Sequence, residues 1–568
     1  GSPWLSSRLF RATDFERSPS RKALPGAQSF NQQGATGTRR TPGLWYATNR
    51  PFWQARPATS GWRARAAPSG LEQGPSVFGV NRPGSRPLTD EDWQMIFNSW
   101  VFLAFFSIVY TLYLLTRRHL RLQNLVLLVA SYVFYGFWDW RFLSLLFAST
   151  VIDFFAGRAM AASQDERRRR LFLAVSMSAN LGMLGFFKYF NFFAESTTAL
   201  LNALGMQADF ITLNILLPAG ISFYTFQTMS YGIDIYRRKL QPTQRFLDFM
   251  LFVSFFPHLV AGPIMRATAL LPQFTRKRHI RVDQVNAGLF LILWGYFKKV
   301  VVADNLAVTA NNVFNNYQNY QGMDLLLAIL AFTFQIYGDF SGYTDIARGI
   351  SKLMGFELNL NFNLPYLAAN PSDFWERWHI SLSSWLRDYL YIPLGGNRCG
   401  SVRTYRNLFL TMLLGGLWHG AAWNFVVWGA YHGLILCAFR RLDPYPEHLR
   451  EHRTVGDSLR LAAKVAFMFM LTVIGWVIFR SGSLEQIAYM LTHVGFGDRS
   501  WTTVSTLWRM MVLISPLLLV QGYQYFSKDL LILSKWKPLA RVPVYAFLLL
   551  AIILLGSRQT TEFIYFQF

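Results

Sequence analysis

The chain has 568 residues, of which 52% are hydrophobic and 17% aromatic, while only 15% are charged. A soluble domain carries about a quarter charged residues, so this composition excludes a soluble enzyme with one anchor and indicates a polytopic membrane protein. The net charge of +24 fits basic loops against anionic lipid rather than nucleic-acid binding, because no basic aromatic stripe is present. The two cysteines, Cys399 and Cys437, show no metal-ligand spacing and no disulfide framework, so no metal site is expected.

Residues 1–94 differ from everything that follows them. They are rich in Arg, Pro, Gly, Ser and Trp, and they lack both a sustained apolar period and a signal-peptide core. Met95 opens the apolar stretch MIFNSWVFLAFF and is a natural start. We therefore expect 1–94 to be a disordered basic extension or an upstream translation without chemistry of its own, and 95–568 to form one membrane domain.

From Met95 onward, apolar runs of spanning length alternate with loops that carry Arg and Lys. The predicted segments are 96–115, 122–138, 141–157, 171–193, 213–235, 246–262, 285–303, 323–340, 407–437, 461–479, 507–525 and 541–556. The segment 407–437 is too long for one simple span, so about eleven or twelve membrane segments are expected in an all-α fold. Basic loops after the first, third and fifth segments place those loops in the cytoplasm and Met95 outside. The sixth segment breaks this alternation, so 246–262 is expected to be re-entrant, with its broken backbone buried in protein or lining a cavity.

The stretch PSDFWERWHISLSSWLRDYLYIPLGG is too polar for a lipid-facing helix and too aromatic for a solvent loop. Ser372 or Asp373 is placed to cap a helix, on which Trp375 and His379 lie four apart and share a face. The pattern is typical of an interfacial helix with Trp anchors and snorkelling Arg, or of a helix that dips into a polar cavity. His379 fits both interpretations.

The stretch LLGGLWHGAAWNFVVWGAYHG places His419 in an apolar, small and aromatic segment, where a polar ring is costly unless it has partners or a function. Gly416 and Gly420 would let another backbone approach closely. On one continuous helix His419 shares a face with Trp423, and Asn424 lies roughly 140° further round. A packing seam with one hydrogen-bonded histidine explains this pattern. The alternative is a neutral imidazole that acts as general base on a hydroxyl attacking an activated carbonyl.

Two further polar clusters remain open to interpretation. Asp339 and Asp345 lie within or next to an apolar span, where carboxylates are functional candidates, although they could equally pair with Arg348 or cap glycine-broken helix ends. His493 and Asp498 have a His-x4-Asp spacing that is loose enough to arise by chance. Phosphate-binding Gly-rich Lys motifs, zinc-protease motifs and the G-x-S-x-G motif do not occur, so ATP-driven transport is not expected.

Several long blocks, in one order from Met95 to Phe568, resemble the membrane-bound O-acyltransferase (MBOAT) family and are most similar to its alginate O-acetyltransferase branch. The blocks are LLPAGISFYTFQTMSYGIDIYR, FFPHLVAGPI, YGDFSGYTDIARG, SDFWERWHISLSSWLRDYLYIPLGGNR, GGLWHGAAWNFVVWGAYHG and EFIYFQF. The resemblance implies re-entrant helices around a central tunnel. It also implies a bacterial inner-membrane enzyme with no bound cofactor, which uses acetyl-CoA from the cytoplasm as co-substrate. The acetyl group would serve O-acetylation of an exported polysaccharide such as alginate, often through a separate extracytoplasmic acetyltransferase protein.

The same resemblance assigns the site residues. The catalytic histidine of the family's LWHG block matches His419, and the histidine of its RWHISLS block matches His379. His419 is then expected to be the general base, while His379 orients the acceptor or stabilises the oxyanion. Asp339 and Asn424 are expected to support them. The donor site is not assigned by the resemblance.

Other functions stay open at this point. The same fold could act on peptidoglycan or cellulose, or transfer D-alanine from a carrier protein to teichoic acid. A transporter or flippase for a lipid-linked sugar, with the histidines along a proton path, belongs to a different class, as does an interaction scaffold. Arg387 and Arg398 would meet donor phosphates if their segment reaches the cytoplasmic side.

Overall fold

The computed structural model describes residues 95–210, 212–213, 215–398, 400–442, 454–497, 500–557 and 563–564. The extension expected over 1–94 lies outside the described residues. Within the described residues the chain is helical, with a single isolated bridge between Gly322 and Val494, and this confirms the predicted all-α class. Seven helical stretches in these ranges are long and apolar enough to cross a membrane. They are Leu120–Ala162, Glu166–Ala203, Val282–Asn315, Met323–Leu353, Val455–Arg480, Trp501–Ser527 and Pro538–Leu555.

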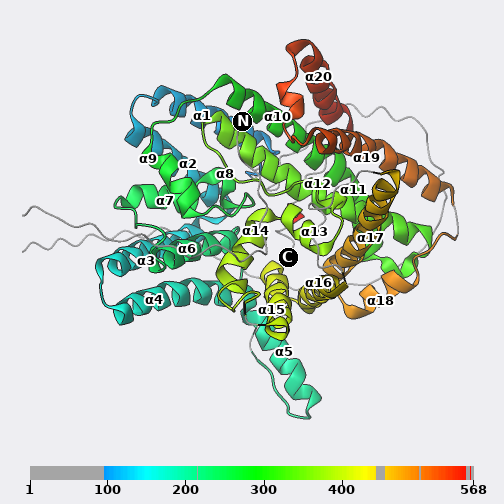
Figure 1. Cartoon of the computed structure of the whole chain (residues 1–568), viewed down its shortest axis with the longest axis horizontal. Coiled ribbons are helices and arrows are strands. Elements are labelled where there is room, and N and C mark those ends of the chain that lie inside the picture. The colour runs from blue at the N-terminus through cyan, green and yellow to red at the C-terminus, as the bar shows by residue number, and fades with distance from the viewer. Residues whose placement is uncertain are drawn as a thin grey trace, which may run out of the picture. The chain divides into compact units, whose positions relative to one another are not determined.

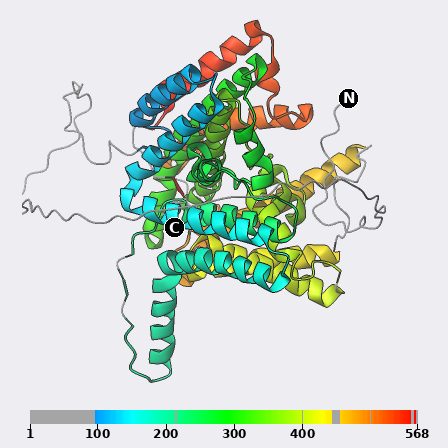
Figure 2. The same ribbon diagram turned by 90° about the vertical axis from the view of Figure 1, so that its left-hand side faces the viewer.

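The helices of the N-terminal half follow the predicted segments in order. They are α1 (Trp100–Leu115), α2 (Leu120–Asp139), α3 (Leu143–Ala162), α4 (Glu166–Leu184), α5 (Phe190–Ala203), α6 (Ile221–Tyr236), α7 (Phe246–Ser254), α8 (Phe256–Leu259) and α9 (Ala267–Thr275). The predicted segment 213–235 begins only at Ile221, because Pro218 and the left-handed Gly220 precede the helix. A π-helical turn, Gly185–Tyr189, joins α4 to α5, and α5 extends away from the bundle (Figures 1 and 2).

The predicted segment 246–262 is a broken helix. Its backbone leaves the helical region at Phe255, between α7 and α8. The amide of Phe256, at the break, donates to the hydroxyl oxygen of Ser131 at 3.1 Å, and both residues are fully buried. The broken backbone therefore lies inside protein with its polar group satisfied, as a break at membrane depth requires.

The C-terminal half builds the centre of the bundle. Its helices are α10 (Val282–Tyr296), α11 (Asp304–Asn315), α12 (Met323–Leu353), α13 (Pro371–Arg377), α14 (Ile380–Leu386), α15 (Ser401–His419), α16 (Trp423–Leu442), α17 (Val455–Arg480), α18 (Leu484–Thr492), α19 (Trp501–Ser527) and α20 (Pro538–Leu555). The short α13 and α14 lie in the middle of Figure 1, with α12, α15, α16 and α17 around them. The α12 helix runs unbroken through its glycines, so the alternative that carboxylates cap glycine-broken helix ends there is wrong.

The predicted segment 407–437 divides into α15 and α16, which fold back on each other. A Cβ atom at Gly416 would lie 2.2 Å from the carbonyl oxygen of Phe425, and one at Gly429 would lie 2.5 Å from that of Met412. Small residues thus allow the two backbones to approach closely, as predicted for Gly416. The prediction that His419 and Trp423 share a face of one helix, with Asn424 further round it, is wrong, because α15 ends at His419 and α16 begins at Trp423.

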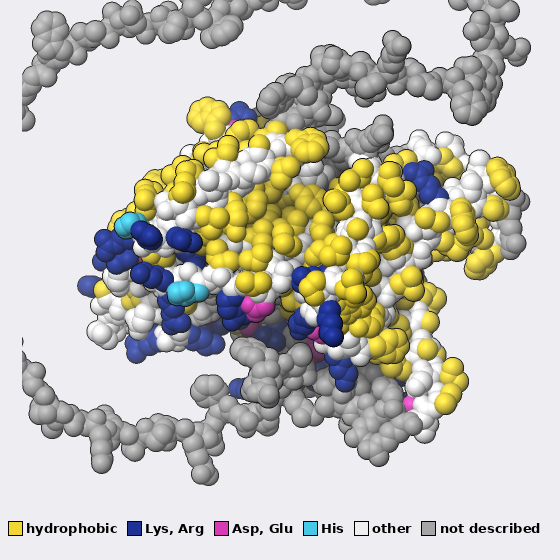
Figure 3. Space-filling model, turned by 90° about the horizontal axis from the view of Figure 1, so that it is seen from above, with side chains coloured by type: hydrophobic (Ala, Val, Ile, Leu, Met, Phe, Trp, Pro, Cys, Tyr) yellow, Lys and Arg dark blue, Asp and Glu magenta, His cyan; other side chains and the backbone are white. Residues whose placement is uncertain are grey.

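The outer surface matches a lipid environment. On the face shown in Figure 3, hydrophobic side chains form a broad surface, and Lys and Arg gather along one side of it. Large apolar side chains are exposed on several of the long helices, including Leu122, Val175, Leu519 and Ile553. Such extensive apolar exposure is unfavourable in water and suits acyl chains.

Candidate active site

The two histidines expected at the site meet in the middle of the bundle. The ring centroids of His379 and His419 lie 6.3 Å apart, and the two side chains are 0% and 4% exposed. The two histidines belong to separate elements of the chain, and only its folding brings them together. At this distance the two tilted rings contact each other, which places two acid–base groups side by side in the core.

His419 is the last residue of α15, and aromatic rings surround its imidazole. The rings of Trp418, Trp428 and Phe479 pack edge-on against it, with centroids 5.1, 5.0 and 5.6 Å away. These rings come from α15, α16 and α17, so three helices fix the direction of one imidazole. The walls are apolar, which strengthens any electrostatic interaction made inside them.

His379 occupies the turn between α13 and α14. Its backbone is left-handed, with φ of 44° and ψ of 53°, a conformation that costs a residue with a Cβ atom about 1–2 kcal/mol. Asn361 stabilises the turn: its carbonyl accepts from the amide of Ile380 at 2.9 Å, and its side-chain oxygen accepts from the hydroxyl of Ser381 at 2.9 Å. The imidazole therefore points into the core from a strained turn that neighbouring hydrogen bonds impose.

The predicted capping of this region needs correction. Asn370, rather than Ser372 or Asp373, caps α13, and its side chain accepts from the amide of Asp373 at 2.9 Å. Because α13 ends at Arg377, Trp375 and His379 do not share a helical face. The helix starts at Pro371, two or three residues earlier than predicted, and His379 lies in the turn after its end.

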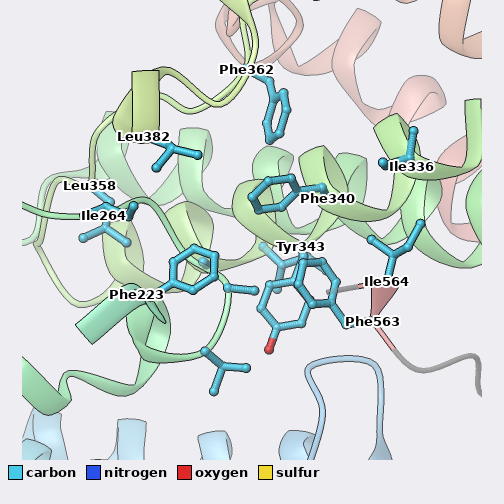
Figure 4. Close-up of a cluster of buried hydrophobic side chains, with 14 of the residues drawn as sticks. Phe223, Ile264, Ile336, Phe340, Tyr343, Leu358, Phe362, Leu382, Phe563 and Ile564 are labelled. Carbon is cyan, nitrogen blue, oxygen red and sulfur yellow. The ribbon is translucent and has the colours of Figure 1, made fainter. Parts of the chain in front are cut away.

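Phe340 of α12 forms the wall behind His379. The two rings pack edge-on at 4.7 Å. The ring of Phe340 also contacts Phe563 at 5.7 Å, and Figure 4 shows Phe563 and Ile564 lying against α12 at Phe340 and Tyr343. A segment far along the chain thereby closes the core next to His379.

Lys188 and Tyr189, which the sequence analysis missed, hold the end of α15. The ammonium group of Lys188 donates to the carbonyl oxygens of Trp418 and His419 at 2.8 and 2.9 Å. The hydroxyl of Tyr189 donates to the carbonyl oxygen of Leu417 at 2.8 Å. These are carbonyls that a helix C-terminus leaves without internal partners, and a cation there also complements the helix dipole. A lone lysine in the apolar run GFFKYFNFF was the available signal, because a cation within a membrane segment is a functional candidate by default.

Asp339 belongs to a buried charge cluster with Lys299 and Asp304. Its carboxylate pairs with Lys299 at 2.7 Å, and Lys299 also pairs with Asp304 at 2.9 Å. The other oxygen of Asp339 accepts from the amide of Ile564 at 2.7 Å. The structure thus gives Asp339 an anchoring contact to Ile564, next to the Phe563 ring that packs on Phe340.

The second acidic residue of this region has cationic partners. Asp345 pairs with Lys298 at 2.6 Å and with Arg348 at 3.1 Å. Pairing with Arg348, one of the two structural alternatives, is therefore confirmed.

Asn424 contacts the site through a neighbour. Its side-chain amide donates to the carbonyl of Phe479 at 3.0 Å, and the ring of Phe479 packs on His419. Asn424 therefore ties the first turn of α16 to the end of α17 and supports the aromatic wall.

The remaining candidates lie apart from the histidine pair. Arg387 pairs with Asp388 at 2.6 Å, and the predicted role of Arg387 and Arg398 toward donor phosphates stays a prediction. The ring of His493 stacks on Tyr489 at 4.0 Å, while Asp498 lies outside the described residues. Within the ranges described, no three His, Cys, Asp or Glu side chains gather as metal ligands would.

A cavity of about 430 Å³ is lined in part by the residues that follow His419 in the chain. It lies between the start of α16, the end of α17 and the π-helical turn that carries Lys188. Its lining includes Lys188, Asn191, Ala421, Asn424 and Arg480. The volume falls within the range of about 300–1,000 Å³ that small-ligand sites occupy.

The comparison with known proteins defines the class. Residues 237–479 match the model of the membrane-bound O-acyltransferase family, MBOAT. The chain is also 37–45% identical to relatives over 70–72% of its length, so it belongs to the membrane-bound O-acyltransferase family. It is therefore a multi-pass membrane protein and an O-acyltransferase, and both expectations are confirmed.

Individual relatives refine this class. The chain is 44% identical over 409 residues to the probable alginate O-acetylase AlgI of Pseudomonas putida, which covers 71% of this chain and 81% of that protein. It is 45% identical over 409 residues to the probable alginate O-acetylase AlgI of Pseudomonas aeruginosa, with 72% and 76% covered. It is 37% identical over 427 residues to the peptidoglycan O-acetyltransferase of Helicobacter pylori, with 70% and 79% covered.

Proposed function

We propose that this O-acyltransferase takes an acetyl group from cytoplasmic acetyl-CoA for the O-acetylation of an exported polysaccharide such as alginate. The observation that carries the proposal is the identity of 44–45% over 76–81% of the length of two alginate O-acetylases. The relatives are bacterial, and the proposed location is the bacterial inner membrane. A separate extracytoplasmic acetyltransferase protein is the proposed partner that hands the acetyl group to the polymer.

In the proposed reaction His419 is the general base. Its imidazole takes the proton of the acceptor hydroxyl while the oxygen forms a bond to the carbonyl carbon of the thioester. The tetrahedral intermediate collapses, the carbon–sulfur bond breaks, and the imidazolium returns the proton to the leaving thiolate. The rings of Trp418, Trp428 and Phe479 around His419 support this role, because an apolar wall keeps out the water that would hydrolyse the thioester.

His379 is the proposed second member of the site. With its ring centroid 6.3 Å from that of His419, the His379 imidazole is close enough for both side chains to approach one reacting group. His379 would orient the acceptor hydroxyl or donate a hydrogen bond to the oxyanion as negative charge develops on it. The strained, fixed turn that carries His379 supports this role, since a preorganised donor costs no reorganisation during the reaction.

Radiolabelled acetyl-CoA tests the proposal. In membrane vesicles the wild-type protein should transfer label to the acceptor, and His419→Ala should reduce the rate by about 100-fold or more. His493→Ala is the matched control, because His493 is an exposed histidine outside the pair, and it should retain the wild-type rate. Transfer that persists in His419→Ala overturns the catalytic assignment. Inside-out and right-side-out vesicles decide the sidedness, since a cytoplasmic donor serves only the former.

Peptidoglycan O-acetylation is the second candidate, favoured by the 37% identity to the Helicobacter pylori enzyme. Both candidates use the same histidine pair, so only the acceptor distinguishes them. Supplying alginate and peptidoglycan fragments in separate assays, each with the extracytoplasmic partner present, decides between them. A transporter would move a lipid-linked sugar without consuming the thioester. Release of free CoA thiol therefore indicates an acyltransferase, and its absence indicates a transporter.

A further inference from the structure

We propose that the cavity beside the end of α15 binds the phosphate group of an anionic phospholipid, with Arg480 as the recognising cation. The bound lipid also holds the preceding residue, Phe479, whose ring packs on His419. Binding of the lipid does not depend on the reaction. Its effect on acetyl transfer rests on the proposed function and adds a regulating ligand to it.

The lining of this cavity combines apolar side chains with cations that have no acid beside them. Its apolar residues include Phe186, Leu217 and Phe425. Positive charge comes from Lys188 and Arg480, and no Asp or Glu belongs to the described lining. In the described part of the chain neither cation forms an ion pair, and the ammonium group of Lys188 donates to carbonyl and hydroxyl oxygens. Partly buried cations without an anion are unfavourable, so the cavity suits a ligand with a negative end and an apolar end.

Arg480 is held in place with part of its hydrogen-bonding capacity unused. One terminal nitrogen, Nη2, donates to the side-chain oxygens of Asn311 and Asn315 at 3.0 and 3.3 Å, and the guanidinium lies 5.5 Å from the ring centroid of Phe314. Within the described ranges, Nε and the second terminal nitrogen, Nη1, have no acceptor. A guanidinium with a fixed plane and unused donors is suited to bind two phosphate oxygens.

Three helices place the cavity at the boundary between the acyl chains and the headgroups. The α4 and α15 helices begin at Arg-rich stretches, which the positive-inside rule places in the cytoplasm, and each has 19 residues. Such a helix rises roughly 28 Å, close to the thickness of the hydrocarbon core, before the residues that line the cavity. The α17 helix, with 26 residues, is also long enough to cross the core, and it ends at Arg480. The cavity therefore lies at the depth of the phospholipid phosphates on the extracytoplasmic side.

The charge of the lining selects one class of lipid. A headgroup with its own cation, such as choline, brings that cation toward Lys188 and Arg480, and the described lining has no acid to bind it. The headgroup of phosphatidylglycerol carries only a phosphate charge and hydroxyls. The first turn of α16 also lines the cavity, and the N-terminal end of a helix favours an anion. The cavity should therefore prefer phosphatidylglycerol to phosphatidylcholine.

One residue connects Arg480 to the proposed base. The ring centroid of Phe479 lies 5.6 Å from that of His419, and the carbonyl of Phe479 accepts from the side-chain amide of Asn424 at 3.0 Å. A phosphate bound to Arg480 fixes the last turn of α17 and hence the ring that packs on His419. Anionic lipid should therefore raise kcat for acetyl transfer and change KM for acetyl-CoA much less, because a displaced base lowers kcat.

Equilibrium binding to the detergent-solubilised full-length protein tests the lipid site. The probes are phosphatidylglycerol and phosphatidylcholine with the same fluorescent acyl chain. Wild-type protein should bind phosphatidylglycerol at least about tenfold more tightly, as one charged hydrogen-bonded contact predicts. Arg480→Gln should remove this preference, and Arg480→Lys should retain part of it, because lysine keeps the charge without the planar donors. Excess inorganic phosphate should not displace the lipid, because only the lipid buries apolar surface in the cavity.

Arg509→Gln is the matched control. Arg509 is an exposed arginine of α19 that also donates to an asparagine side-chain oxygen, at 3.3 Å from Asn305, but it does not line the cavity. This variant should leave both affinities unchanged. Equal binding of the two lipids by wild-type protein overturns the proposal, as does an equal loss in the Arg480 and Arg509 variants, which would indicate non-specific attraction.

Two other outcomes would assign the cavity to a different ligand. Complete displacement of the lipid by inorganic phosphate would identify a site for free phosphate, and the lipid assignment would be wrong. If phosphatidylglycerol fails to bind and Arg480→Gln instead abolishes co-purification of the extracytoplasmic partner, the cavity recognises a protein, and the proposal is equally wrong.

Acetyl transfer in vesicles tests the effect on His419. Wild-type protein should have a higher kcat in vesicles of phosphatidylcholine with phosphatidylglycerol than in phosphatidylcholine alone, whereas Arg480→Gln should have the same lower kcat in both. A wild-type kcat that does not depend on phosphatidylglycerol overturns the connection through Phe479. Thermal unfolding of each variant shows that it remains folded. Failure of the proposed function has a different signature, since no CoA thiol would be released in either vesicle while the lipid affinities stay as predicted.

Discussion

The ammonium group of Lys188 donates to the carbonyl oxygen of His419 at 2.9 Å, across 231 positions of the chain. It also donates to the carbonyl of Trp418, and its ammonium lies 5.9 Å from the centre of that indole ring. One side chain thus fixes the backbone of the proposed base and the ring beside it. The position of the imidazole therefore depends on Lys188, which lies outside the sequence blocks that resemble the MBOAT family.

Replacing Lys188 with Met should therefore reduce the rate constant of acetyl transfer. Methionine is also unbranched and lacks only the terminal nitrogen position, so it leaves the last carbonyls of α15 without a donor. A displaced general base costs about 100-fold in kcat, while KM for acetyl-CoA should change much less. Steady-state assays in vesicles measure both, normalised to folded protein. Tyr189→Phe, which removes one neutral hydrogen bond, is the control and should lose far less; a wild-type kcat in the Lys188 variant would show that the cap is unnecessary.

His379→Gly and His379→Ala should separate the role of the ring from that of the backbone. Glycine adopts a φ of 44° without strain, whereas alanine keeps the penalty of about 1–2 kcal/mol that the left-handed region imposes. Both variants should lose at least about 100-fold in the rate of acetyl transfer if the imidazole is used. The melting temperature should be higher for the glycine variant than for the alanine variant. Activity retained in His379→Gly would limit His379 to a structural role.

Gly416→Ala should destabilise the protein. The new Cβ atom would lie 2.2 Å from a carbonyl oxygen of α16, and backbone atoms cannot move aside without separating the helices. Overpacking of this kind costs about 1–3 kcal/mol. Gly522→Ala is the matched control, because no atom lies within 4 Å of its Cβ position, and it should stabilise α19 by about 0.5–1 kcal/mol. Thermal unfolding in detergent should move in opposite directions for the two variants.

Asp339→Asn should act on stability and on the segment that carries Ile564. Removing the carboxylate leaves Lys299 with Asp304 alone, and breaking a buried ion pair costs about 3 kcal/mol or more. We expect a lower melting temperature and faster proteolysis at the C-terminal segment. An unchanged melting temperature combined with lost acetyl transfer would instead assign Asp339 to the chemistry.

The sequence predicted most of the helices, because an apolar run of spanning length must be covered by lipid or protein whatever its partners are. It did not predict where helices end inside such runs. Neither the end of α15 at His419 nor the π-helical turn before α5 is marked by proline or by a pair of charges. Both depend on contacts between segments more than 200 positions apart, such as that of Lys188 with His419.

The candidate site was likewise predicted from the sequence only in part. Family blocks pointed to His379 and His419, and the structure brings the two rings together. The left-handed turn at His379 could not be predicted, because a residue with a Cβ atom seldom adopts that conformation and the hydrogen bonds of Asn361 that help to hold it come from another part of the chain. The aromatic wall of His419 was equally hidden, since Trp428 and Phe479 read as ordinary packing residues.

The contact between Asp339 and Ile564 has a consequence for biosynthesis. The two residues are 225 positions apart, and at about 5–20 residues per second the ribosome needs roughly 10–45 seconds to make the intervening chain. During that time Phe340 and Tyr343 of the most buried long helix have no Phe563 to pack against. The pair of Lys299 and Asp304 does not depend on Ile564, because these two residues are close in sequence. The wall behind His379 is therefore completed only after Phe563 has been made, long after the ribosome has made Phe340 itself.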